Sequence, residues 1–159
     1  MQKRVLIPCL LMILVAPRPA FAQDYTAKLD ATLEKIKSHL AEKKPGWGHK
    51  AIEPMEGSRN VSVNNWESES SGIRVSIIAY GSDADAKEAM RHFAGDERTL
   101  DRLPDLCDGG YSWRMGGSNI AFRKGDVTIW VSGSVTNLAE GVALSKEFAA
   151  LIAEALAAS

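Results

Sequence analysis

Cysteine is scarce in this sequence of 159 residues, which contains only Cys9 and Cys107. Because Cys9 falls in an N-terminal segment that we expect to be cleaved, the mature chain keeps one thiol and cannot form an intramolecular disulfide. The fold must then be stabilised by its hydrophobic core, for which the chain is long enough. Three interpretations of Cys107 are open: a buried small hydrophobic residue, which is the usual one, an intermolecular bridge, or a reactive group.

Motifs that would indicate catalysis or a metal site are also missing. The three histidines, His39, His49 and His92, are too widely spaced to form a short metal-binding motif, so we expect no metal ion and no cofactor. The sequence Leu-Cys-Asp-Gly-Gly around Cys107 matches none of the known cysteine-enzyme signatures, and no Gly-x-Ser-x-Gly elbow occurs. The sequence therefore assigns no catalytic residue.

An excess of basic residues is absent as well. The 19 Lys and Arg residues are interspersed with 20 Asp and Glu residues, which gives a formal net charge of −1. Removal of the N-terminal segment, which contains three basic residues and no acidic one, leaves a mature charge of about −4. Since a phosphate-binding protein needs a concentrated basic face, nucleic acid is not expected as a partner.

The hydrophobic run at the N-terminus is too short to span a membrane. Val5–Ala16 comprises 12 residues, whereas about 18 or more are needed. It follows two basic residues and precedes Ala20-Phe21-Ala22, which has the small residues that a signal peptidase requires. These features predict a cleavable signal peptide over residues 1–22 and a single domain over 23–159 that is periplasmic or secreted. A retained membrane anchor is the alternative; after cleavage no stable anchor remains.

Three segments have the periodicity of amphipathic helices. The first is Thr26–Lys43. A middle helix is predicted after Ser82, which forms a capping box with Asp85, and a long C-terminal helix after Asn137, which is followed at the same spacing by Glu140. Their apolar residues are, in chain order, Leu29, Leu33, Ile36 and Leu40, then Ala86, Ala89, Met90 and Phe93, then Val142, Leu144, Phe148, Leu151, Ile152, Ala155 and Leu156.

Four runs alternate apolar and polar residues, as strands with one buried face do. Asn60–Glu67 and Gly72–Tyr80 are separated by a short polar segment, so we predict an antiparallel hairpin. Asn119–Lys124 and Gly125–Ser132 form a second hairpin around the two-residue loop Lys124-Gly125. Counting outward from this loop gives the predicted pairs, which are Arg123 with Asp126, Phe122 with Val127, Ala121 with Thr128 and Ile120 with Ile129.

The remaining segments are less regular. Residues 46–58 are expected to be irregular or short extended chain. In residues 96–118 the spacing of three leucines indicates one or two helical turns, followed by a short strand between Gly109-Gly110 and Gly116-Gly117. Such a stretch can carry function, but the favoured interpretation is a surface excursion held to the core by its leucines and Cys107.

Together these elements predict an α+β domain, with an antiparallel sheet of five or six strands and an N-terminal, a middle and a long C-terminal helix packed on it. The expected order is helix, two or three strands, helix, three strands, helix. This order is similar to that of helix-flanked antiparallel folds such as the PsbP-like fold. The similarity covers the order of elements alone.

Aromatic residues are few, at 7% of the chain, so several on one face of a sheet are candidates for a binding site. The second hairpin places Trp130 on the face opposite the core, with Ile78 and Tyr80 of the earlier strand. This apolar face needs a cover, which is either the first helix, the favoured interpretation, or a ligand or partner in a groove. The candidate ligand-binding residues, all in or beside predicted strands, are Trp130, Tyr80, Trp66 and Trp113.

From the sequence we expect a non-catalytic exported domain that binds a small ligand, a lipid or another envelope protein. The alternative is a small periplasmic hydrolase that uses the irregular loop around Cys107. Catalysis would require a histidine within hydrogen-bonding distance of Cys107 or of a loop carboxylate in a cleft. The positions of the histidines therefore distinguish the two hypotheses.

We predict that translocated protein recovered outside the cytoplasm begins at Gln23. Signal peptidase accepts the small residues of Ala20-Phe21-Ala22, and Pro17 and Pro19 separate this site from the apolar helix. Intact-mass measurement of the recovered protein tests the prediction. A translocated chain that still contains residues 1–22 would show that this segment is a membrane anchor.

Overall fold

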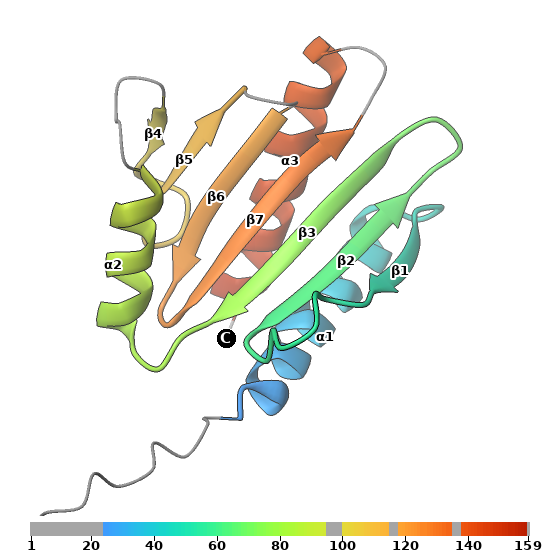
Figure 1. Cartoon of the computed structure of the whole chain (residues 1–159). Helices are drawn as coiled ribbons and strands as arrows, with labels where there is room; N and C mark the ends of the chain where they lie inside the picture. The colour runs from blue at the N-terminus through green and yellow to red at the C-terminus, as the bar shows by residue number, and fades with distance from the viewer. Residues whose placement is uncertain (1–23, 95–99, 115–117, 135–137, 159) are drawn as a thin grey trace, which may run out of the picture.

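The computed structural model describes residues 24–94, 100–114, 118–134 and 138–158 (Figure 1). Within them one antiparallel sheet of seven strands packs against three helices, none of which is long and apolar enough to cross a membrane. The predicted signal peptide lies outside the described residues and stays a prediction. In chain order the elements are α1 (Thr26–Lys43), β1 (Gly48–Ile52), β2 (Val61–Glu67), β3 (Gly72–Ala79), α2 (Asp83–Ala94), β4 (Asp101–Leu103), β5 (Gly110–Trp113), β6 (Ser118–Lys124), β7 (Val127–Ser134) and α3 (Leu138–Ala157).

The strands form two meanders that meet in the middle of the sheet. Strands β1 to β3 are consecutive neighbours, as are β4 to β7, and the full order is β1-β2-β3-β7-β6-β5-β4. The central pair, β3 with β7, is antiparallel and joins segments that are far apart in sequence. In this pair Val75 lies opposite Val131 and Ile77 opposite Ile129. Such β-branched pairs favour extended chain and pack well across strands.

The α+β class, the antiparallel sheet and the three helices agree with the prediction, but the sheet has more strands than the five or six expected. Strand β1 lies within residues 46–58, and β4 makes the second group of strands four instead of three. The helical turns expected from Leu100, Leu103 and Leu106 were wrong. The same spacing suits a short strand and a turn, because Leu103 ends β4 and its carbonyl accepts from the Leu106 amide at 3.3 Å.

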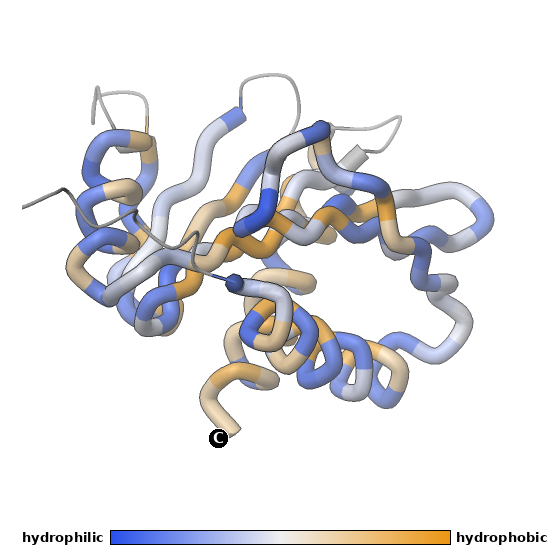
Figure 2. The backbone as a smooth tube through the Cα atoms, turned by 60° about the horizontal axis from the view of Figure 1, so that its bottom comes forward, coloured by the Kyte–Doolittle hydropathy of each residue, from blue (hydrophilic) through white to orange (hydrophobic). Residues whose placement is uncertain are grey.

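The hydrophobic core lies between one face of the sheet and helices α1 and α3, which Figure 2 shows on the same side of the sheet. From the helices, Ile36, Phe148 and Ile152 are fully buried. They pack with residues of four strands, which are Trp66, Ile73, Val75, Ile77, Ala79, Ile120, Phe122, Val127, Ile129 and Val131. Odd-numbered residues of β3 and β7 therefore face the core, and even-numbered residues face away from it.

Of the two interpretations of the Trp130 face, cover by the first helix is wrong. The apolar stripe of α1 packs in the core with Ile129 and Val131, on the other side of the sheet. The core face attracts the helix because it is a continuous apolar surface, whereas Arg74 and Ser132 interrupt the opposite face. Helix α2 covers part of that opposite face through Phe93, which contacts Trp130. We call the sheet face opposite α1 and α3 the open face.

The C-terminal hairpin is confirmed, but its loop lies one residue further along the chain than predicted. The loop is Gly125-Asp126, with Lys124 opposite Val127 and Phe122 opposite Ile129. Gly125 has a φ of 56°, and a left-handed glycine at the first loop position is typical of a type II′ turn. Because the register differs from the prediction by two residues, every side chain keeps its predicted face.

The predicted pair of Arg123 with Asp126 is replaced by ion pairs to other elements. Arg123 on β6 pairs with Asp83 at the start of α2 and lies 3.7 Å from Asp108. Asp126 in the turn pairs with Lys28 of α1. The β6–β7 turn therefore holds the first turns of α1 and α2 against the same end of the sheet.

The predicted helices are confirmed where their signals lie in the described residues. Helix α1 has the predicted bounds. At the start of α2, Ser82 Oγ accepts a hydrogen bond from the Asp85 amide at 3.1 Å and donates to Asp85 Oδ2 at 2.8 Å, which is the expected capping interaction. Helix α3 forms in the predicted place, and its expected cap, Asn137, lies outside the described residues.

Gly110 allows β5 to approach β6 closely. A Cβ atom at this position would lie 2.5 Å from the Ala121 carbonyl oxygen and 2.7 Å from the Phe122 Cβ atom. We predict that Gly110→Ala lowers the free energy of unfolding by about 1–3 kcal/mol, because the two strands must separate to admit the methyl group. Urea unfolding measures this loss. Gly48→Ala is the control, since its Cβ would meet only the Glu67 carbonyl oxygen at 3.8 Å; equal losses in both variants would contradict the prediction.

Candidate functional site

A row of side chains crosses the open face at right angles to the strands. Arg74 of β3 lies opposite both Asn65 of β2 and Ser132 of β7. Ser132 in turn lies opposite Asn119 of β6. Directly opposed residues of antiparallel strands point to the same face, with Cβ atoms about 4.5–5.5 Å apart. The complete cross-strand row, from one side of the sheet to the other, is Lys50, Asn65, Arg74, Ser132, Asn119 and Trp113.

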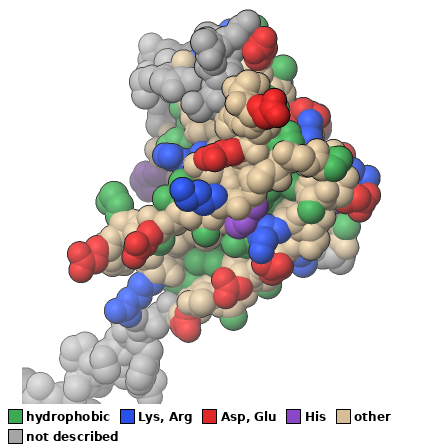
Figure 3. Space-filling view, turned by 90° about the vertical axis from the view of Figure 1, so that its right-hand side faces the viewer, with side chains coloured by type: hydrophobic (Ala, Val, Ile, Leu, Met, Phe, Trp, Pro, Cys, Tyr) green, Lys and Arg blue, Asp and Glu red, His purple; other side chains and the backbone are tan. Residues whose placement is uncertain are grey.

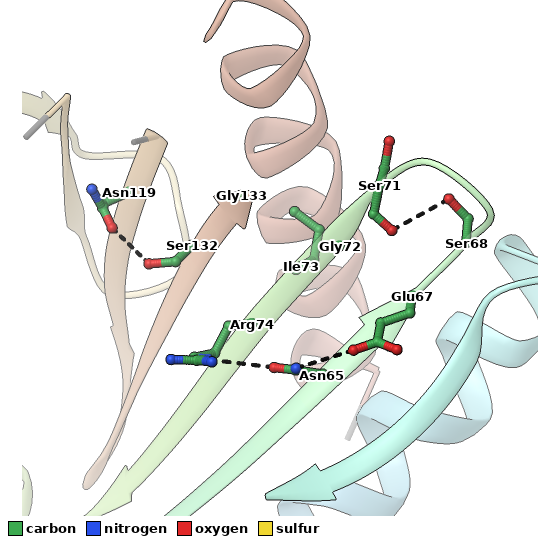
Figure 4. Close-up of a pocket in the computed structure, with 10 residues that line it drawn as sticks. All are labelled: Asn65, Glu67, Ser68, Ser71, Gly72, Ile73, Arg74, Asn119, Ser132 and Gly133. Carbon is green, nitrogen blue, oxygen red and sulfur yellow. Dashed lines mark hydrogen bonds between the residues drawn. The ribbon is translucent and has the colours of Figure 1, made fainter. Parts of the chain in front are cut away.

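Asn65 links Arg74 to Glu67 by two hydrogen bonds (Figure 4). Its Oδ1 accepts from Arg74 Nε at 3.4 Å, and its Nδ2 donates to Glu67 Oε1 at 3.3 Å. The amide therefore orients both charged side chains and lies between them. Arg74 makes no ion pair within the described residues. Its two terminal nitrogens are accordingly left for a ligand.

Asn119 organises the other half of the row. Its Oδ1 accepts hydrogen bonds from Ser132 Oγ at 2.6 Å and from Trp130 Nε1 at 3.4 Å. Asn119 is only 7% exposed, whereas Trp130 is 36% exposed. A buried amide therefore holds the polar edge of an indole ring that is still accessible to a ligand.

Trp130 belongs to an aromatic cluster of three rings, with Phe93 of α2 and Trp113 of β5. The ring centroids lie 4.8 Å apart for Phe93 and Trp113, 5.3 Å for Phe93 and Trp130, and 5.4 Å for the two tryptophans. Tilted rings at these distances attract one another. The aromatic cluster thus fixes the last turn of α2 to the sheet and places apolar surface beside the cross-strand row.

A shallow hollow of about 620 Å³ lies over the row. This volume is within the range of small-ligand sites. Its wall toward the β2–β3 hairpin includes Ser68, whose Oγ donates to the Ser71 carbonyl at 3.4 Å (Figure 4). The lining is mostly polar, and it consists of Asn65, Glu67, Ser68, Ser71, Gly72, Ile73, Arg74, Asn119, Ser132 and Gly133.

The open face carries positive charge although acidic residues outnumber basic residues in the chain, 20 to 19. The register places Lys50, Arg74, Arg102 and Arg123 on this face, because each lies opposite, directly or through intervening strands, residues that face away from the core. Among the described strand residues on this face, Glu67 is the acidic one. Arg123 is neutralised by acidic groups, but Lys50, like Arg74, has no ion pair within the described residues. The face is therefore suited to an anion.

The structure separates the four aromatic residues predicted for a ligand site. Trp113 and Trp130 lie together on the open face. Trp66 faces the core, is 2% exposed and lies against the His49 ring with centroids 4.8 Å apart. Tyr80 follows β3, and its backbone amide donates to the β6–β7 turn at 2.8 Å. Two of the four residues are thus brought into one site.

Sequence reasoning missed Asn65, Arg74, Asn119 and Ser132. Each occupies an alternate position of a predicted strand, and this alternation is the signal that would have placed them on the face away from the core. Their meeting depends on the pairing of β3 with β7, which no turn motif in the sequence specifies. Polar side chains in a partly exposed strand also do not stand out from ordinary solvent-facing residues.

Each of the three histidines contacts a residue other than Cys107. His39 Nε2 is 3.3 Å from a carboxylate oxygen on α3, and His92 Nε2 is 2.9 Å from one on α2. His49 Nε2 lies 2.9 Å from Oδ1 of the buried Asn64. The described residues also contain no group of three or more His, Cys, Asp or Glu that could hold a metal ion. The described part of the chain therefore forms no Cys–His pair of the kind a hydrolase around Cys107 would need.

A second depression, of about 710 Å³, lies between α1 and strands β1 and β2. Its lining includes the apolar Leu29 and Leu33 and the fully buried Asn64, whose Nδ2 donates to Ser62 Oγ at 2.9 Å. Figure 3 shows the side of the molecule on which β1 forms the edge, with acidic and basic side chains interspersed over it. This side has no predominant charge, in contrast to the open face.

No protein-family model and no curated protein matches this chain. Among solved structures it is similar to a GTP binding regulator from Thermotoga maritima, with a TM-score of 0.49 and 15% sequence identity over 80% of this chain and 86% of that one. A similarity at this level carries no inference about function.

We predict that Cys107 reacts slowly with thiol reagents in the folded protein. Its partly buried Sγ lies 4.0 Å from the Ala153 carbonyl oxygen. Burial raises the pKa of the Cys107 thiol above its usual value, Lys124 opposes this shift and Asp108 adds to it. Less thiolate is therefore present at neutral pH, and labelling should accelerate with rising pH and on denaturation. Fast stoichiometric labelling of the folded protein, or a covalent dimer that is lost on reduction, would contradict the prediction.

Proposed function

We propose that this protein is an exported, non-catalytic domain that binds a small ligand on the open face of its sheet. The observation that carries the proposal is the accessible Trp130 ring, whose Nε1 donates to Asn119, one of four residues of the cross-strand row that line a hollow. A ring supplies apolar contact and the row supplies directional groups, which is the combination that small-ligand sites use. Export rests on the sequence of residues 1–22.

The construction of the site supports binding. Asn65, Arg74, Ser132 and Asn119 come from four adjacent strands, so the backbone ladder holds their positions. Sites built on strands are more precisely positioned than sites built on loops. Groups that are already in place bind a ligand at a lower entropic cost.

A small ligand fits this face better than the lipid or the envelope protein that the sequence also allowed. Among the described residues, the exposed large hydrophobic side chains are Met55, Phe93 and Trp130, and Met55 lies in the loop between β1 and β2. Two rings offer little apolar surface for an acyl chain. A stable protein interface commonly buries about 800 Å² on each partner around a well-packed apolar centre, which the polar hollow does not provide.

We predict that Trp130→Ala affects binding more than stability. Because Trp130 is 36% exposed, the substitution should lower the free energy of unfolding by about 1–2 kcal/mol. Trp66→Ala, at a position only 2% exposed, should cost about 3–5 kcal/mol. Denaturant unfolding compares the two variants. A loss for Trp130→Ala as large as that for Trp66→Ala would show that the Trp130 ring is mainly structural.

Binding is measured by a thermal-shift screen of the mature domain against sugars, small carboxylates and phosphates, since a ligand of the native state raises the unfolding midpoint. The shift caused by a hit should be lost in Trp130→Ala. It should persist in Met55→Ala, which removes an 83% exposed apolar side chain from a loop outside the hollow. A screen without hits, or equal shifts in both variants, would contradict the proposed function.

A further inference from the structure

We infer that the ligand of the open face is an acidic saccharide whose carboxylate is bound by Arg74. The inference rests on the proposed binding function and adds the chemical class of the ligand. Three features support it: a guanidinium group without an ion pair, a positively charged face around it, and a lining of hydroxyl and amide groups beside an indole ring.

The guanidinium of Arg74 is oriented but not neutralised. Its Nε donates to Asn65 Oδ1 at 3.4 Å, which leaves Nη1 and Nη2 as the edge that can bind a carboxylate through two parallel hydrogen bonds. Figure 4 shows this group pointing away from Glu67, toward β7. Because Asn65 lies between Glu67 and Arg74, the carboxylate of Glu67 does not take the place of a ligand.

The surrounding charge selects an anion. Lys50 occupies the same row two strands away, and Arg102 occupies the same face on β4. A mature chain with a net charge of about −4 thus gathers cations on one face, which provides electrostatic complementarity to a negative ligand. A carboxylate presents its two oxygens in one plane, which matches the planar edge of the Arg74 guanidinium.

The rest of the lining suits a hydroxyl-rich ring. The hydroxyl of Ser132 donates to Asn119 at 2.6 Å and keeps its lone pairs for a ligand hydroxyl. Trp130 lies diagonally across from Arg74, two residues along β7 from Ser132, at a distance of about 7–8 Å. A sugar whose carboxylate binds Arg74 therefore places its ring near the exposed indole. An apolar ligand would instead leave these polar groups without partners, at a cost in affinity.

The test compares an oligosaccharide of galacturonic acid with its methyl ester, which has the same rings and hydroxyl groups but no charge. Isothermal titration calorimetry of the mature domain at low salt should show binding of the acid and at least about tenfold weaker binding of the ester. Added salt should weaken binding of the acid, because the contact to Arg74 is exposed and ionic.

Substitutions assign the effect to Arg74. Arg74→Ala should weaken binding of the acid at least about tenfold, and Arg74→Lys should restore only part of it, because an ammonium group cannot form the paired hydrogen bonds. Arg59→Ala removes the same charge from an exposed loop outside the hollow and should change the affinity less than about twofold. Circular dichroism of each variant verifies the fold.

Equal affinities for the acid and the ester, or an Arg74→Ala variant that binds as well as Arg59→Ala, would overturn the assignment of an acidic ligand. If Trp130→Ala abolishes binding in that case, the proposed binding function stands and only the acidic nature of the ligand is rejected. If inorganic phosphate displaces the acidic oligosaccharide at the same concentration as galacturonic acid does, the saccharide class is overturned. Failure of both oligosaccharides to bind also overturns the inference, while the thermal-shift screen decides the binding function separately.

Discussion

The antiparallel pairing of β3 with β7 is the interaction on which the rest of the structure depends. It joins the meander of β1 to β3 to the meander of β4 to β7, and without it the chain would form two separate small sheets. Val75 and Val131 meet at its centre and are fully buried beneath α1 and α3. On the opposite side of the same two strands, Arg74 and Ser132 meet on the open face. One ladder thus produces both the core and the candidate site.

Because successive side chains of a strand point to opposite faces of the sheet, the register of β3 against β7 decides the composition of both faces. A slip of one residue in β3 would turn Arg74 into the core and expose Ile73, at the cost of a buried charge and of lost apolar burial. The packing of the core therefore fixes which residues of the cross-strand row lie opposite one another, and no further interaction is needed to align them. Asn65 and Asn119 then refine the positions of Arg74 and Trp130 through hydrogen bonds.

Local sequence was sufficient wherever one element decides its own structure. The apolar stripe of Thr26–Lys43, the capping box at Ser82 and the two predicted hairpins all appear in the structure. Local sequence was insufficient to predict strands β1 and β4, because short edge strands are stabilised by pairing with a neighbouring strand more than by their own residue pattern. The loop at Gly125 was misplaced by one residue, since a two-residue turn accepts glycine at either position.

The sequence by itself determined the three long helices and, for each predicted strand, the side on which each side chain lies, because both are periodic properties of a segment. The predicted face of each side chain in the second hairpin was correct even though the predicted register was wrong. Only the tertiary structure decided which strands are neighbours, so only it placed Arg74 between Asn65 and Ser132, put Trp66 and Trp130 on opposite faces, and set α1 on the core side. The physical reason is that pairing β3 with β7 closes a long loop, and its entropic cost is offset by apolar burial summed over the whole core, which no local segment contains.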